Sequence, residues 1–189
     1  MKEMIAKEVK SVTDHVDIGS VPDASAWRFG DLFRQSGDLE SARLLYERAV
    51  KAARVEDRRV NDSLQLARVM AMQGDVIGAI KVAETTFSAP PTEKAPIMMS
   101  ALYEIYPAGK GKGKDVELAK FLEKAIEQHM LVEVDPSSES GKAFLETLQI
   151  HVSKAWDIVL GTFAREQKTD LFDAAIKHRE ELDAKSGHV

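Results

Sequence analysis

Apolar residues recur along most of the chain at the three- and four-residue spacings of amphipathic helices. The clearest example is the stretch 115–130, in which Val116, Ala119, Leu122 and Ile126 fall on one side of a helix. Residues that favour helices are plentiful, whereas glycine and proline number only 11 and 6 among 189 residues. The pattern therefore predicts an all-α protein.

Two stretches repeat the same arrangement around a Gly-Asp pair. The segments "FGDLFRQSGDLESARLLYERAVKAA" and "LARVMAMQGDVIGAIKVAETTFSAPP" align at Gly37-Asp38 and Gly74-Asp75, 37 residues apart. In each copy about a dozen helical residues precede the pair, and a second amphipathic run follows it. Glycine can take the left-handed conformation that ends a helix, and the aspartate can cap the next helix. The repeat predicts two helical hairpins.

The two copies resemble the tetratricopeptide repeat (TPR) family. The matching positions are Phe29, Gly30, Phe33, Ala42, Tyr46 and Ala49 in the first copy, and Leu66, Ala67, Met70, Ala79, Ala83 and Pro91 in the second. The resemblance covers roughly residues 24–130. It implies a right-handed α-solenoid of about three hairpins, because a single hairpin cannot bury its own apolar face and has to stack on others.

The third hairpin follows the proline-rich break "SAPPTEKAP", with a short helix expected up to Pro107 and the helix of 115–130 after it. The sequence between them, "YPAGKGKGKD", lacks the pattern of a phosphate-binding loop, since Asp115 stands where Ser or Thr is required. Its glycine spacing resembles the wide turn of Sel1-like repeats, relatives of the TPR. We therefore expect a turn; whether Lys110, Lys112 and Lys114 bind an anionic partner stays open.

We expect a single helical-repeat domain over 1–189. Residues 1–23 would form an N-terminal segment, 24–134 the hairpins, and 135–189 capping helices that cover the last apolar face of the solenoid. Within the cap, the stretch 140–167 fits either one long helix or two short ones.

Composition narrows the classes of function. A net charge of -5 argues against nucleic acid as a partner, and no apolar run reaches the length of a membrane span. The start of the chain has no signal-peptide core, so a cytoplasmic protein is expected; whether the chain is a complete protein or an excised domain stays open. There is no cysteine, no helical pair of zinc-binding histidines and no Gly-x-Ser-x-Gly motif. The sequence therefore predicts no catalytic residue, no metal and no cofactor.

The resemblance implies that the chain binds another protein, because the first helix of each TPR hairpin lines a concave groove that holds a peptide or helix. The positions expected in that groove are Trp27, Asp31, Arg34, Asn61, Leu64, Gln65, Arg68, Met72, Ser100 and Glu104. Trp27 could instead pack against the N-terminal segment. The lysine-asparagine clamp with which one TPR subclass holds chaperone tails is replaced here by Trp27, Asp31 and Gln65, so that ligand is not expected.

Two alternatives to partner binding stay open. The solenoid could self-associate, as a homo-oligomer or as a spacer in a larger assembly. It could also hold a small ligand or carry an enzymatic site near Trp156.

Overall fold

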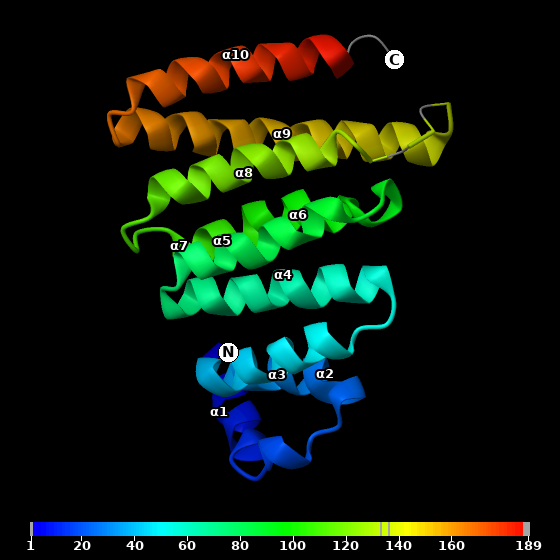
Figure 1. Ribbon diagram of the computed structural model, residues 1–189, viewed down its shortest axis with the longest axis vertical. Coiled ribbons are helices and arrows are strands. Elements are labelled where there is room, and N and C mark those ends of the chain that lie inside the picture. The colour runs from blue at the N-terminus through cyan, green and yellow to red at the C-terminus, as the bar shows by residue number, and fades with distance from the viewer. Residues whose placement is uncertain (1, 133, 136, 187–189) are drawn as a thin grey trace. The chain divides into compact units, whose positions relative to one another are not determined.

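In the computed structural model, which describes residues 2–132, 134–135 and 137–186, the regular structure is helical (Figure 1). The described residues contain no strand, so the all-α prediction is confirmed. They divide into two compact units, of which unit 1 ends at Thr86 and unit 2 begins at Phe87. The division falls inside the stretch 24–134 that the sequence assigns to hairpins. None of the described helices is both long enough and apolar enough to cross a membrane.

Unit 1 consists of helices that each pack on the next one along the chain. They are α1 (Lys2–Thr13), α2 (Ala26–Ser36), α3 (Leu39–Ala52), α4 (Glu56–Gln73) and α5 (Val76–Glu84), with the short turns η1 (Ile18–Ser20) and η2 (Asp23–Ser25) between α1 and α2. Figure 1 shows the hairpins α2–α3 and α4–α5, in which the chain reverses direction at a tight turn.

Both hairpin turns have the geometry that the sequence predicts. Gly37 and Gly74 end α2 and α4 in the left-handed conformation, with φ of 90° and 93°. The Asp38 and Asp75 carboxylates each accept a hydrogen bond from the backbone N–H three residues later, at 3.1 and 3.0 Å. They thereby cap α3 and α5, and they satisfy N–H groups that have no partner inside the helix.

Small residues allow the helices of unit 1 to approach closely. Ala42, Ala67 and Ala79 are fully buried, while Phe33 and Tyr46 fill the space around them. All five residues are positions that match the repeat pattern in one of the two copies, and all five are buried in the core of this unit.

Arg48 holds the connection between α1 and α2 against α3. Its guanidinium donates to the backbone carbonyl of Ile18 at 2.8 Å and also to the carbonyl of Val21. It forms an ion pair with Asp23 at 2.8 Å. These contacts fix η2 beside the C-terminal end of α3.

Unit 2 contains the remaining helices. They are α6 (Ala95–Ser100), the π-helical turn η5 (Ala101–Ile105), α7 (Tyr106–Gly109), α8 (Asp115–His129), α9 (Glu139–Arg165) and α10 (Thr169–Ser186). Two short turns precede them, η3 (Thr85–Ser88) and η4 (Pro91–Glu93), and the boundary between the units falls within η3. α6 packs on α8, α8 on α9 and α9 on α10. Of the two alternatives for 140–167, one long helix is the correct one.

The first helical stretch of unit 2 does not stop before Pro107, as the sequence suggested, but continues through η5 and α7 to Gly109. Pro107 lies in the first turn of α7, where its missing N–H breaks no hydrogen bond of that helix. The chain then turns at Gly111 and Gly113, which have φ of 78° and 77°. Asp115 accepts a hydrogen bond from the Gly111 N–H at 2.8 Å and begins α8. The prediction of a glycine turn is confirmed.

Candidate partner-binding site

The most organised polar arrangement on unit 1 joins Trp27, in the first turn of α2, to Arg58, in the first turn of α4. The guanidinium carbon of Arg58 is 3.8 Å from the centroid of the Trp27 ring, a close cation–π contact. Arg58 Nε also donates a hydrogen bond to Asp62 Oδ2 at 3.1 Å, and Arg58 Nη2 lies 2.9 Å from Asp62 Oδ1 as an ion pair. Because the stacking contact links α2 to α4, the first helices of the two hairpins touch at this end.

Asp62 is the buried member of this arrangement, with an exposed fraction of 3%. Burial raises the pKa of its carboxyl above the ordinary aspartate value, while the positive charge of Arg58 acts in the opposite direction. A buried carboxylate without a partner would be strongly destabilising, so Asp62 and Arg58 hold each other in place. The guanidinium is thereby fixed over the Trp27 ring.

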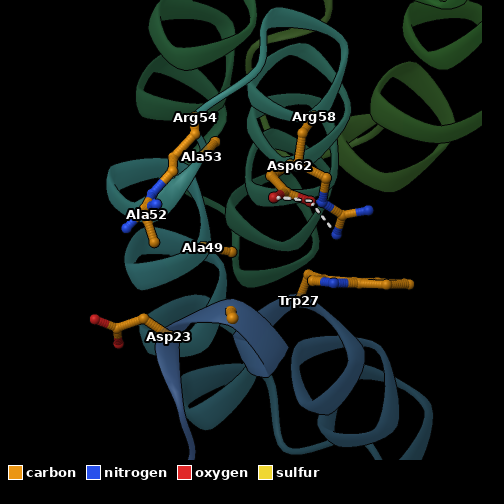
Figure 2. A pocket seen from close by; sticks show the side chains of 9 residues that line it. Asp23, Trp27, Ala49, Ala52, Ala53, Arg54, Arg58 and Asp62 are labelled. Carbon is orange, nitrogen blue, oxygen red and sulfur yellow. Dashed lines mark hydrogen bonds and ion pairs between the residues drawn. The ribbon is translucent and has the colours of Figure 1, made fainter.

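An open cleft of about 300 Å³ lies beside this stack, as Figure 2 shows. The residues that line it are Asp23, Ala24, Trp27, Ala49, Ala52, Ala53, Arg54, Arg58 and Asp62. In Figure 2, Arg54 and Asp23 lie on one side of the alanines, and Trp27 with Arg58 lies on the other. The cleft thus combines a small apolar surface with an aromatic ring and charged groups at its edges.

Two further residues of the predicted groove, Asp31 and Arg34, bind each other and Tyr46. Asp31 Oδ1 accepts from Tyr46 Oη and from Arg34 Nη2, both at 2.8 Å. Burial raises the pKa of the Tyr46 hydroxyl, so it remains a protonated donor. The side chain of Arg34 is only 16% exposed. Asp31 and Arg34 therefore stabilise the α2–α3 hairpin, whatever else they bind.

The predicted groove residues of α4 have different environments. Asn61 is exposed and donates to the Asp57 carbonyl at 2.9 Å, whereas Gln65, Arg68 and Met72 are half-buried. Arg68 Nη1 donates to Gln65 Oε1 at 3.5 Å.

Leu64 and Glu104 do not share the environment of these residues. Leu64 is 1% exposed, so its side chain packs in the core of unit 1 and does not line an open surface. Glu104 and Ser100, which the sequence also assigned to the groove, belong to unit 2 and are half-buried there.

The sequence alone did not indicate Arg54, Arg58, Asp62 or Asp23. The Gly-Asp alignment predicts about a dozen helical residues before Gly74, but α4 has 18, so Arg58 fell outside the expected hairpin. The available signal was the four-residue spacing of Arg58 and Asp62, which suits an ion pair on one face of a helix.

A second cleft, of about 550 Å³, lies in unit 2 between the C-terminal end of α8 and α10. Its lining residues are Glu127, Gln128, Met130, Leu131, His178, Glu181, Leu182 and Lys185. His178 Nδ1 is 2.7 Å from Glu123 Oε1, and His178 Nε2 is 3.2 Å from Glu127 Oε1. Trp156 packs edge-on against this imidazole but is 1% exposed and does not line the cleft. Among the residues that the structure describes, no group of three or more potential ligands could hold a metal ion.

The lysines of the glycine turn are exposed at separate positions. Lys110, Lys112 and Lys114 all lie at the surface, and Lys114 Nζ is 3.9 Å from Glu117 Oε1. An anionic partner at these lysines stays a hypothesis.

No known protein family, no functionally characterised protein and no solved structure matches this chain. The choice between the Trp27 cleft of unit 1 and the His178 cleft of unit 2 therefore depends on the chemistry of the residues that line them. Unit 1 offers an aromatic ring at the edge of a cleft, stacked on a guanidinium that a buried carboxylate holds in place.

Proposed function

We propose that the chain is a protein-interaction module that holds a peptide segment or a helix of a partner protein, without covalent chemistry, on the face formed by α2 and α4. The observation that carries the proposal is the Trp27–Arg58 stack beside an open cleft of about 300 Å³. Tryptophan and arginine contribute much of the binding energy at protein interfaces. Because Asp62 already holds Arg58 over the ring, binding would cost little side-chain freedom.

In this proposal the hairpins α2–α3 and α4–α5 are the first two repeats of a right-handed, TPR-like solenoid. The third hairpin, with its two left-handed glycines, would be Sel1-like, and α9 and α10 would be the cap. The left-handed glycine and the aspartate cap that the two Gly-Asp turns share support this assignment, as does the contact between α2 and α4 through Trp27 and Arg58. The binding face would continue along α4 to Arg68 and Met72.

A peptide selection tests the proposal. A phage-displayed library of short random peptides is selected on the immobilised full chain, and recovered peptides are titrated by fluorescence anisotropy. We expect Trp27→Ala to weaken their binding by about tenfold or more, as the loss of an aromatic anchor does at other interfaces. Arg68→Ala should weaken the binding of those peptides that are long enough to reach the middle of α4.

Tyr103→Ala is the matched control, because Tyr103 is a 40% exposed aromatic residue in unit 2. It should leave the affinity unchanged, and circular dichroism should show that each variant remains helical. Peptides whose affinity is insensitive to Trp27→Ala would refute the assignment of the site, as would a selection that enriches no peptide.

Self-association is a second candidate function, favoured by the exposed apolar residues in the first half of α9. Phe144, Leu145 and Ile150 are 37%, 39% and 68% exposed. Sedimentation over a range of concentrations tests this candidate. If α9 mediates assembly, the wild-type protein sediments as an oligomer at high concentration, and Ile150→Lys sediments as a monomer.

A further inference from the structure

Around the Trp27 cleft, the acidic side chains all have ion-pair partners, whereas some of the basic side chains have none in the part of the chain that the structure describes. Both carboxylates that line it already have guanidinium partners. Asp23 lies 2.8 Å from Arg48, and Asp62 lies 2.9 Å from Arg58. Neither carboxylate is left to attract a cation, because its charge is balanced within unit 1.

One further guanidinium group lines the cleft and another lies near the Trp27 ring, and neither has such a partner within the described residues. Arg54 lines the cleft from the connection between α3 and α4; it is exposed, and no acidic side chain among the described residues pairs with it. Arg28 is also exposed, lies 5.0 Å from the centroid of the Trp27 ring, and likewise has no acidic partner in the described part of the chain. The uncompensated charge at the cleft is therefore positive, although the whole chain carries a net charge of -5.

The apolar part of the cleft limits the kind of ligand that fits. Its surface between the charged groups comes from four alanines, Ala24, Ala49, Ala52 and Ala53, and the Trp27 ring stands at one side. Small alanine side chains leave room for a side chain of the partner, and the ring offers it a flat apolar contact. The arrangement thus suits a peptide that combines an apolar group with an anionic one.

We infer that the segment bound at this cleft is acidic: a carboxylate of an Asp, a Glu or a chain terminus pairs with Arg54, and a neighbouring apolar side chain covers the alanines against Trp27. This inference rests on the proposed function, since it names the chemistry of the partner at the same site. Arginine suits this task because its planar guanidinium can bind both oxygens of a carboxylate. Arg28 adds a second positive charge near the same ring. Nucleic acid is the less suitable anion, because it is usually bound by an extended basic surface on a basic domain.

Charge reversal at Arg54 tests the inference. The same phage library is selected in parallel on the wild type, on Arg54→Glu and on Lys51→Glu. Lys51 is an exposed residue of α3 that does not line the cleft, so its variant carries the same change in net charge. We expect the wild type and Lys51→Glu to enrich peptides rich in Asp and Glu, and Arg54→Glu to lose that preference or favour Lys and Arg. Acidic peptides from the wild-type selection should bind Arg54→Glu at least about tenfold more weakly, with a smaller dependence on salt.

The other possible outcomes distinguish a failure of the acidic inference from a failure of the proposed function. If the peptides depend on Trp27 but are neutral or basic, or if Arg54→Glu binds them as the wild type does, the acidic inference fails while the proposed function stands. If no peptide is enriched, or if binding is insensitive to Trp27→Ala, both fail. A single-stranded oligonucleotide that displaces the peptides and loses affinity in Arg54→Glu would show that the cleft binds phosphate, and the inference would also be wrong. Arg54→Gln serves as a second variant, because it removes the charge without introducing a repulsive one.

Discussion

The aromatic ring of Tyr46 lies directly against the backbone of Gly30. A Cβ atom at Gly30 would be only 3.0 Å from Tyr46 Cε2 and 3.1 Å from Cδ2. The Tyr46 ring is 1% exposed, and its hydroxyl donates to Asp31, the residue after Gly30. A single glycine thus allows α2 and α3 to pack at the distance that this hydrogen bond requires.

Gly30→Ala should therefore destabilise unit 1, although alanine is the better helix former. Overpacking of a filled core costs about 1–3 kcal/mol, and the roughly 1 kcal/mol that alanine gains in helix propensity offsets part of it, so we expect a net loss of up to about 2 kcal/mol. Urea denaturation followed by Trp27 fluorescence in a Trp156→Phe background measures unit 1 alone.

Gly161→Ala provides the opposite case. Gly161 lies on the exposed side of α9, and a Cβ there would have no neighbour within 4 Å. This variant should stabilise unit 2 by up to about 1 kcal/mol, measured by Trp156 fluorescence in a Trp27→Phe background. If Gly30→Ala and Gly161→Ala both stabilise their units, the contact between Gly30 and Tyr46 is looser than the structure shows.

Capping by Asp38 gives a second prediction. Its carboxylate accepts from the Ser41 N–H at 3.1 Å at the start of α3. Asp38→Ala should lower the free energy of unfolding of unit 1 by about 1 kcal/mol, whereas Asp38→Asn, which keeps an acceptor, should cost much less. Equal losses for the two variants would show that the negative charge, and not the hydrogen bond, stabilises the helix.

The features that the sequence predicted well are those set by local chemistry. Gly37 and Gly74 had to adopt positive φ for the chain to reverse, and the aspartate after each is a strong capping residue, so both turns were predictable. The small and large positions around Tyr46 followed from the same repeat. These features need only the spacing of residues within one hairpin.

The site was less predictable, because it depends on contacts between hairpins and on the lengths of helices. Trp27 was identified, but its partner Arg58 lies in a part of α4 that extends beyond the repeat. Leu64 shows the same limitation, since a small error in the rotation of α4 moves a side chain from the groove into the core. The path of the chain through Pro107 was also missed, because the π-helical turn before it has no clear sequence signal.

The glycine turn before α8 gives a third prediction. Gly111 and Gly113 both have left-handed backbones, and a Cβ atom at either position would meet no other atom within 4 Å, so conformation and not space limits a replacement. Gly113→Ala should destabilise unit 2 by about 1–2 kcal/mol. Lys110→Ala, at an exposed position in the same turn, should change the stability by less than about 0.5 kcal/mol. A larger effect for the lysine, measured by Trp156 fluorescence, would show that the charges stabilise this turn.

His129 gives the last prediction, which concerns the pH dependence of unit 2. This side chain is 3% exposed, lies 6.2 Å from the Phe144 ring between centroids, and neither ring nitrogen has a hydrogen-bond partner in the described structure. Burial lowers the pKa of His129 to about 4, and the positive charge of His151 acts in the same direction. The folded protein therefore keeps His129 neutral at pH values where the unfolded chain would bind a proton.

The sign of the effect follows from this difference in proton binding. Between the ordinary histidine pKa of about 6.5 and the folded value of about 4, the unfolded state binds more protons, so unit 2 loses stability as the pH falls through this range. The loss is complete below about pH 4 and amounts to roughly 3 kcal/mol. His129→Leu should remove this component and should also stabilise unit 2 at neutral pH by about 1–3 kcal/mol, because it eliminates a buried N–H without an acceptor. Urea denaturation at several pH values, with His15→Leu as the exposed control, measures the difference. Parallel pH curves for the wild type and His129→Leu would show that the imidazole is not held neutral in the fold.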